Sequence, residues 1–143
     1  MNKVLLLLIF LVSISFAFAN SNLPPCPKSL NQTWDNCWGS VSKDGERYVG
    51  EWKNNKWDGQ GIMYFKHSVS VDKYVGEFKN NKIHGYGTEY HRNGHSISGE
   101  FRNNNPIGLL ICKFPDNKKY LCEYINKEFR IYEQTDMVLE DIR

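Results

Sequence analysis

Apolar and polar positions alternate along residues 48–65, and the same pattern returns along residues 74–91. Most positions of the two segments are identical, and the aromatic residue Trp52 in the first corresponds to Phe78 in the second. Alternation with a period of two predicts β-strands. A lysine-flanked Asn-Asn pair in the middle of each segment predicts a tight turn, because asparagine tolerates positive φ. Each segment is therefore predicted to be a β-hairpin.

Weaker copies of this segment flank the central pair. Cys37-Trp38-Gly39 matches the return half of a copy, residues 97–101 open a third copy, and residues 120–124 open a fourth. A repeated unit of this length cannot bury an apolar face alone, so successive hairpins are expected to stack. The predicted fold is all-β, a single-layer, elongated antiparallel meander of stacked hairpins.

Glycines recur on the strand face that carries the large aromatic residues, where each glycine leaves a floor for a flat ring. The positions predicted to be structural within the repeats are Tyr48, Gly50, Glu51, Trp52, Gly59, Gly61, Tyr74, Gly76, Glu77, Phe78, Gly85, Gly87, Gly99, Glu100, Phe101 and Gly108. In the third copy Leu110 replaces the second return glycine. A ligand groove along the whole length is therefore not expected.

These residues resemble the MORN repeat (membrane occupation and recognition nexus), whose pattern is Tyr-x-Gly-Glu-Trp followed by Gly-x-Gly and an aromatic residue. The two central copies match this pattern nearly in full, and with the weaker copies the resemblance covers roughly residues 34–124. The resemblance implies a module for protein contacts, dimerisation or membrane association.

The first 19 residues have the composition of a secretory signal peptide. Lys3 supplies the positive charge, residues 4–12 form an apolar run, and Ala17-Phe18-Ala19 is a small-x-small cleavage site. The run is too short for a spanning helix. We expect cleavage after Ala19 and a secreted or periplasmic protein, with retention of the segment as an anchor as the alternative.

The rest of the chain divides by composition into three parts. Residues 20–33 form a proline-containing lead-in, residues 34–125 carry the repeats, and residues 126–143 form a C-terminal extension. Within the extension, residues 129–132 are a candidate for one more strand, and residues 133–143 for a short acidic helix or a tail.

All four cysteines follow the predicted cleavage site, and an even count in an exported chain favours disulfides. Cys112 and Cys122 flank a hairpin connection, and counting inward from both places them directly opposite each other on one face. Cys26 would then pair with Cys37. The alternative, a metal site, is disfavoured because no Cys-x-x-Cys pair is present. No cofactor is expected.

Charge and motifs exclude several classes of function. The chain has 18 basic and 16 acidic residues, so its near-neutral charge gives no argument for nucleic-acid binding. Glu51, Glu77, Glu100 and Glu123 recur at one strand position, which is typical of architecture and not of an active site, and we expect them solvated or paired across strands. We expect no enzyme.

The histidines form a second candidate cluster. His84, His91 and His95 lie within twelve residues and could hold a transition metal, but ordinary loop histidines are favoured. We therefore predict no metal site.

Two surfaces are candidates for binding. The basic residues at the turns, Lys53, Lys56, Lys79, Lys82 and Arg102, should line one edge of the stack. They would attract anionic lipid, or they would serve only solubility and block edge pairing. Tyr64, Tyr86 and Tyr90 should point away from the glycine face and, with Trp57, form an aromatic patch for a protein partner or for the C-terminal tail. Open sheet edges at both ends would also allow self-association.

Overall fold

The computed structural model describes residues 21–143, so the predicted signal peptide lies outside the described residues. This part of the chain forms nine strands: β1 (Cys37–Lys43), β2 (Glu46–Lys53), β3 (Lys56–Tyr64), β4 (Val71–Lys79), β5 (Lys82–His91), β6 (Ser96–Arg102), β7 (Asn105–Lys113), β8 (Lys119–Ile125) and β9 (Glu128–Gln134). A single 3-10 turn, η1 (Leu139–Ile142), follows them. The predicted extra strand near the C-terminus is therefore present as β9.

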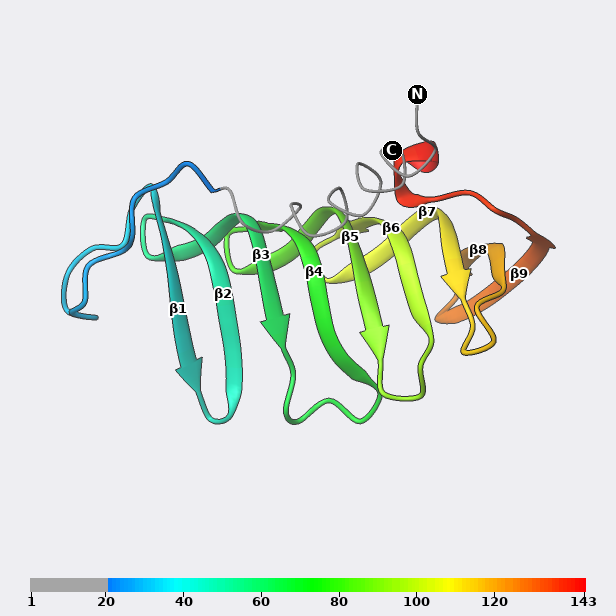
Figure 1. The fold of residues 1–143 in the computed structure, drawn as a ribbon, viewed down its shortest axis with the longest axis horizontal. Coiled ribbons are helices and arrows are strands. Elements are labelled where there is room, and N and C mark those ends of the chain that lie inside the picture. Colours follow the sequence, from blue (N-terminus) through cyan, green and yellow to red (C-terminus); the bar gives the residue numbers. More distant parts are fainter. Residues whose placement is uncertain (1–20) are drawn as a thin grey trace, which may run out of the picture.

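The nine strands make one open antiparallel sheet in which the spatial order is the chain order (Figure 1). β1 and β9 are its two edges, and the C-terminal tail crosses back from β9 toward β6 and β7. The prediction of an all-β, single-layer meander is confirmed. No helix within residues 21–143 is long and apolar enough to cross a membrane.

Each hairpin of the central repeats closes with two residues at positive φ. At the β2–β3 turn these are Asn54 and Asn55, with φ of 50° and 60°, and the β4–β5 turn repeats the geometry at Asn80 and Asn81, with φ of 50° and 64°. A two-residue turn with both residues in the left-handed region matches the twist of the flanking strands. The Asn-Asn pairs therefore build the turns that the sequence predicted.

A β-bulge interrupts the β2–β3 ladder between Gly50 and Trp52 and brings Gly59 opposite Glu51. Gly59 has φ of +102°, and a Cβ added to it would lie against the Glu51 carboxylate. Between the Gly50–Gly61 and Trp52–Trp57 pairs, the single residue Glu51 of β2 faces three residues of β3, whereas on the other side of β3 the register pairs Gly59 with the buried Phe78. The same arrangement recurs at Gly85.

The core is a continuous series of aromatic side chains on the inner face of the sheet, which we call the aromatic spine. Neighbouring ring centroids lie 4.8–5.4 Å apart along the path Trp34, Trp52, Tyr48, Phe78, Tyr74 and Phe101. Every one of these rings is at most 8% exposed, and most contacts are edge-to-face, the geometry that aromatic quadrupoles prefer.

Tyr48 and Tyr74 lie over paired glycines of the neighbouring strands. A Cβ added at Gly61 would contact the Tyr48 ring, and one added at Gly87 would contact the Tyr74 ring. The predicted floor for a flat ring is therefore present in both central copies. Trp57 differs from its prediction: it stacks on Tyr48 at 4.9 Å, because β3 begins at Lys56 and pairs Trp57 with Trp52 on the inner face.

The third copy fills the same space with a different pair of residues. Ile97 stands at the tyrosine position and Leu110 at the second return glycine, and both are buried. Leu110 packs against Gly99 and forms a second core cluster with Ile97, Cys112 and Cys122. The Leu110 side chain thus fills the space that the tyrosine ring fills in the central copies.

Both predicted disulfides are present in the structure. Cys26 is bonded to Cys37 with Cα atoms 4.9 Å apart, which ties the proline-containing lead-in to β1. Two hydrogen bonds to Trp38 hold the same segment. The Trp38 N–H donates to the Pro24 carbonyl, and the Cys26 N–H donates to the Trp38 carbonyl, each at 2.8 Å.

The second disulfide joins Cys112 to Cys122 in a register that differs from the predicted one. Cys112 lies opposite Tyr120, and Cys122 lies opposite Leu110, so the bonded cysteines are diagonal neighbours with Cα atoms 6.0 Å apart. The turn centres on residues 115–117, one residue earlier than the midpoint of the two cysteines. A register change of two residues keeps both side chains on the same face, so the pairing survives.

Candidate functional site

The turns of successive hairpins are joined by a repeated pair of hydrogen bonds. The side-chain oxygen of Asn81 accepts from the Trp57 N–H at 2.8 Å, and the Asn81 N–H donates to the Trp57 carbonyl at 3.0 Å. Asn55 makes the same pair with Trp34, and Asn104 makes it with Ile83. We call these contacts the asparagine ladder. The asparagines were predicted only as turn residues, although their recurrence at a fixed offset was a signal for a contact between repeats.

The ladder holds the basic turn residues in one line, which we call the tip row. Lys53, Lys56, Lys79, Lys82 and Arg102 are all exposed, as predicted for an edge of the stack. The Lys56 Nζ lies 3.5 Å from the Asn80 side-chain oxygen of the next turn. Neighbouring turns are therefore close enough for one ligand to contact both.

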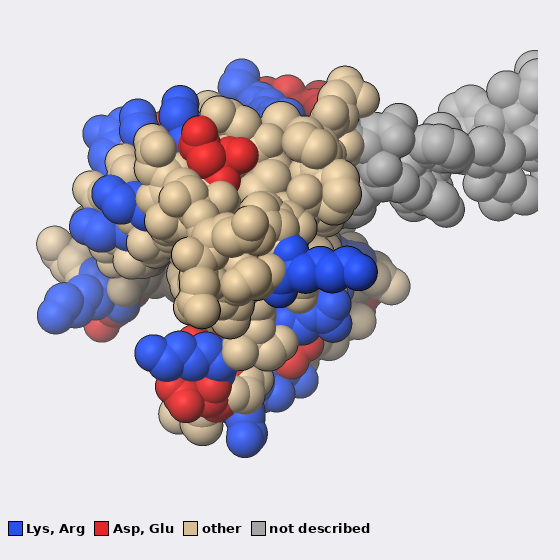
Figure 2. Space-filling view, turned by 90° about the vertical axis from the view of Figure 1, so that its left-hand side faces the viewer, with Lys and Arg blue, Asp and Glu red and all other residues tan. Residues whose placement is uncertain are grey.

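Acidic side chains also reach the tip row. An Asp35 oxygen accepts from the Asn54 N–H at 2.9 Å, and an Asp58 oxygen accepts from the Asn80 N–H at 3.3 Å. Viewed from the β1 end, Lys and Arg side chains are spread over several sides of the molecule with Asp and Glu between them (Figure 2). The tip row is therefore mixed in charge, which the sequence analysis did not foresee at these two aspartates.

The recurrent glutamates have different partners in each copy. Glu51 accepts from the Ser21 hydroxyl at 3.2 Å, Glu77 pairs with Arg143 at 2.8 Å, and Glu100 pairs with Arg102 at 3.3 Å. In the fourth copy Glu123 accepts from the Tyr132 hydroxyl at 2.9 Å, and this bond raises the pKa of Tyr132. Of the basic partners expected, Arg102 alone pairs with a row glutamate within residues 21–143, and it does so from the same strand.

The outer face of the sheet presents a cross-strand row of aromatic and basic residues. Tyr64 lies opposite Lys73, and Lys73 lies opposite Tyr90, so the two tyrosines stand on either side of Lys73 across three strands. The Lys73 Nζ lies 4.8 Å from the centre of the Tyr90 ring, within cation–π range. Arg47 lies opposite Tyr64 on the next strand. We call these four residues the outer row.

Tyr86, the third tyrosine of the predicted patch, contacts the C-terminal tail. The Arg143 guanidinium lies 5.5 Å from the centre of its ring while it pairs with Glu77. Tyr64 and Tyr90 stay 40% and 39% exposed. The aromatic patch therefore consists of two tyrosines, since the tail covers the third.

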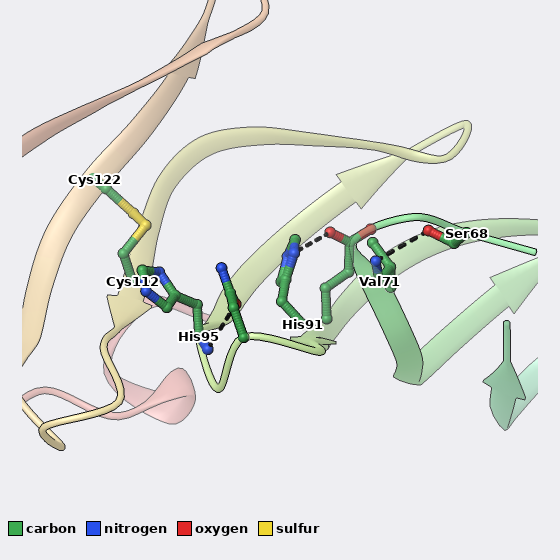
Figure 3. A network of polar contacts seen from close by, with 8 residues as sticks. Ser68, Val71, His91, His95, Cys112 and Cys122 are labelled. Atoms are coloured by element: carbon green, nitrogen blue, oxygen red, sulfur yellow. Dashed lines mark hydrogen bonds and ion pairs between the residues drawn. A yellow bond between two sulfur atoms is a disulfide. The ribbon is translucent and has the colours of Figure 1, made fainter. Parts of the chain in front are cut away.

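The histidines that the sequence offered as a candidate cluster have separate partners. His91 faces Glu89, with 3.6 Å between the Nε2 and the carboxylate, whereas His95 lies toward the Cys112–Cys122 disulfide and 4.7 Å from the Phe114 ring (Figure 3). No group of three or more metal-ligating side chains occurs within residues 21–143. The two imidazoles therefore line a mainly apolar hollow near β7 and β9.

Burial raises the pKa of Tyr48 and of Tyr74 well above the ordinary tyrosine value, and nearby carboxylates add to the effect. Each hydroxyl donates to a backbone carbonyl, Tyr48 to Glu51 at 2.9 Å and Tyr74 to Glu77 at 3.3 Å. Both hydroxyls are neutral donors that fix the ring over its glycines. These tyrosines are structural.

An open sheet whose strands follow chain order, with side chains that recur from hairpin to hairpin, defines the class of β-repeat proteins. The MORN repeat family model matches residues 48–66 and 74–96, which contain the two central copies. These two segments of the chain are MORN repeats. MORN repeats are generally modules that bind proteins or lipids. Comparison with curated proteins finds no match.

Proposed function

We propose that this protein is an exported, non-catalytic binding module that contacts a protein partner through the outer row. The single observation that carries the proposal is the pair of exposed rings, Tyr64 and Tyr90, held on either side of Lys73. Tyrosine and arginine are enriched at protein interfaces because they combine large contact area with polar groups. The outer row offers both on a rigid strand surface.

The geometry of the outer row suits recognition without rearrangement. Residues two strands apart lie roughly 10 Å from each other, and the cross-strand register fixes this spacing between Tyr64 and Tyr90. Strand-borne side chains lose less freedom on binding than side chains in a mobile loop. The aromatic spine beneath the same strands supports this rigidity.

Two further observations support the other parts of the proposal. Two disulfides suit an oxidising compartment, consistent with export after cleavage at Ala19. The residues that recur in the two central copies have packing roles, such as Tyr48 over Gly61, and a repeated structural residue is not a catalytic one. We therefore assign binding, and not chemistry, to this chain.

Site-specific photo-crosslinking in the cells that export the protein tests the proposal. A photoreactive phenylalanine analogue placed at position 64 or 90 should give a discrete, protease-sensitive adduct on illumination. The matched control is position 69, because Val69 is 96% exposed in the loop after β3 but lies outside the outer row. Equal adducts at all three positions, or none at 64 and 90, would reject the outer row as the contact surface.

The second candidate function is peripheral binding to anionic lipid through the tip row. The observation that favours it is the alignment of Lys53, Lys56, Lys79, Lys82 and Arg102 along one edge by the asparagine ladder. Near an anionic surface each basic side chain contributes up to about 1 kcal/mol, and salt weakens the attraction. Asp35 and Asp58 at the same tips reduce the net attraction, which places this function second.

Co-sedimentation with vesicles over a salt series separates the two functions. Binding to anionic but not neutral vesicles, lost at high salt and lost when the four tip lysines are changed to glutamine, would establish the lipid function. The outer-row variant Tyr64→Ala/Tyr90→Ala should leave any such lipid binding unchanged. No binding at low salt would eliminate the lipid function.

A further inference from the structure

The C-terminal tail, residues 135–143, returns from β9 and brings a guanidinium group to β4 and β5 (Figure 1). Two hydrogen bonds hold the start of the tail to β8. The Thr135 N–H donates to the Lys119 carbonyl at 2.9 Å, and the Lys119 Nζ donates to the Met137 carbonyl at 3.2 Å. Most of the described side chains of the tail are exposed. A segment with so few buried contacts detaches from the sheet more easily than a core strand does.

At the end of the tail, the Arg143 guanidinium lies between a carboxylate and an aromatic ring. Its Nη2 donates to the Glu77 Oε1 at 2.8 Å, and its Cζ lies 5.5 Å from the centre of the Tyr86 ring. A planar guanidinium combines a charge-assisted hydrogen bond to a carboxylate with a cation–π contact to a ring. Glu100 lies directly opposite Tyr86 on β6. We call Glu77, Tyr86 and Glu100 the guanidinium site.

The fold of the repeat places the Glu77 carboxylate. The β4–β5 ladder is bulged at Glu77, and a Cβ added at Gly85 would lie against the Glu77 Oε2. Because Gly85 has no side chain, Oε2 lies over β5 while Oε1 accepts from Arg143. Glu51 lies over Gly59 in the same way in the first copy, far from the tail. The repeat, and not the tail, therefore holds this carboxylate in position.

Tyr86 distinguishes the second copy from its neighbours. The residue at the corresponding position is Gln60 in the first copy and Leu109 in the third, although the glutamate recurs in all three. A residue that every copy shares serves the stacking of hairpins, whereas stacking does not require a ring that one copy alone carries. The combination of a glutamate with an aromatic ring is therefore a feature of one place on the sheet, as expected for a binding site.

We propose that the guanidinium site binds an arginine side chain of a partner protein, and that Arg143 occupies the site in the free chain. The Arg143 and Glu77 side chains are 47% and 34% exposed, so a competing arginine can reach the carboxylate. Within residues 21–143, Arg143 is the ion-pair partner of Glu77, whereas Glu100 pairs with Arg102 at 3.3 Å. Displacement of the tail thus leaves one carboxylate for the incoming guanidinium. Lysine fits less well, because an ammonium group cannot stack on the ring while it donates.

Arg143 acts in this arrangement as an intramolecular competitor. If the tail leaves the site free about a tenth of the time, the apparent affinity for the partner is about tenfold lower than that of the empty site. The site goes beyond the proposed function and does not depend on it. Tyr86 and the outer-row residue Tyr90 lie four residues apart on β5, roughly 13 Å at the rise of a strand, so the two sites can be tested separately.

An NMR titration of the isotope-labelled, purified protein with the peptide acetyl-Gly-Arg-Gly-amide tests the proposal. In Arg143→Ala we expect saturable shifts of the Glu77 and Tyr86 amide resonances, with an apparent affinity about tenfold higher than in the unchanged protein. In the unchanged protein the peptide should also move the Arg143 Nε–H resonance toward its position in Glu77→Gln, because the peptide displaces the tail. Unchanged circular dichroism shows that each variant is folded.

Matched variants identify the groups that bind the peptide. In the Arg143→Ala background, Glu77→Gln should abolish the shifts, whereas Glu51→Gln, the same change in the first copy, should preserve them. Tyr64→Ala/Tyr90→Ala should also preserve them, which separates this site from the outer row. The corresponding lysine peptide should bind more weakly. Free arginine should bind more weakly too, because its α-carboxylate would lie near the carboxylates of the site.

Several results would overturn the proposal. These are the absence of saturable shifts in Arg143→Ala, the same affinity with and without Arg143, and equal losses in Glu77→Gln and Glu51→Gln. A lysine peptide that binds as tightly as the arginine peptide would show that the site attracts any cation. Tighter binding of free arginine than of the peptide would assign the site to a small molecule and not to a partner protein.

Discussion

The asparagine ladder predicts a stability change for Asn81→Gly whose sign distinguishes turn preference from the hydrogen bond between repeats. Asn80 and Asn81 occupy the two central positions of the β4–β5 turn, and both have positive φ. Glycine is favoured at such positions, above all at the second, so turn preference alone predicts that Asn81→Gly is neutral or stabilising. The ladder predicts the opposite. The side chain of Asn81 bonds to the backbone of the preceding repeat, by accepting from the Trp57 N–H at 2.8 Å, whereas the Asn80 side chain makes only a 3.5 Å contact with Lys56.

The magnitude follows from the one hydrogen bond that the substitution removes. Asn81→Gly keeps the backbone bond to the Trp57 carbonyl but deletes the side-chain acceptor, at a net cost of about 1 kcal/mol. Asn80→Gly is the matched control, because it introduces the same residue at positive φ and removes only a 3.5 Å contact with Lys56 at the surface. Turn preference favours glycine more at position 81 than at position 80, so a lower stability of Asn81→Gly than of Asn80→Gly comes from the lost bond to Trp57. For a domain of this size the difference corresponds to about 4 °C in Tm.

Urea denaturation followed by tryptophan fluorescence measures the free energy of unfolding of both variants. We expect the midpoint of Asn81→Gly to lie below that of Asn80→Gly at an unchanged m-value, which indicates an unchanged extent of unfolding. If Asn81→Gly is as stable as Asn80→Gly or more stable, the bond between repeats adds nothing and the reasoning fails.

Two further predictions concern the aromatic spine. Because burial raises the folded-state pKa of Tyr48 and Tyr74, the unfolded chain ionises first, so stability holds below about pH 10 and then falls by about 1.4 kcal/mol per pH unit for each tyrosine. Denaturation at several alkaline pH values measures this slope, which should flatten when both tyrosines are changed to phenylalanine. Gly87→Leu should destabilise by about 3 kcal/mol, because its side chain would overlap the Tyr74 ring. Adding Tyr74→Ile should restore much of the lost stability, since Ile97 and Leu110 make the corresponding pair in the third copy. Thermal unfolding measures this, and a double variant no more stable than Gly87→Leu alone would refute it.

The sequence was sufficient for the fold because the repeat supplies the same evidence several times. Alternation and paired asparagines at positive φ predict each hairpin, and successive hairpins can bury an aromatic face only by stacking. The disulfide pairing followed from the hairpin at Cys112 and Cys122 even though the register was wrong, because an error of two residues keeps the strand face. Features that depend on parity are therefore predictable without the turn geometry.

Features that depend on an irregular strand pairing were not predictable in this way. At the bulge after Gly50 three residues of β3 face Glu51, and a Cβ added at Gly59 would lie against the Glu51 carboxylate. Nothing in the alternation indicates where a strand gains residues. The covering of Tyr86 by Arg143 depends on the path of the tail, which has no repeat to check it. Residue type was therefore enough to identify the candidate surfaces, whereas tertiary contacts determine which residues belong to each surface.

The order of strands in the sheet has a consequence for how the chain folds. Each of the nine strands pairs only with strands that are adjacent in sequence, so sheet formation needs no pairing between strands that are distant in the chain. Folding rates rise as contacts become more local, and an antiparallel meander is the all-β arrangement with the most local pairings. A chain that emerges from its N-terminus can add one hairpin at a time onto the edge already formed. Refolding after dilution from denaturant should accordingly be fast for a β-protein.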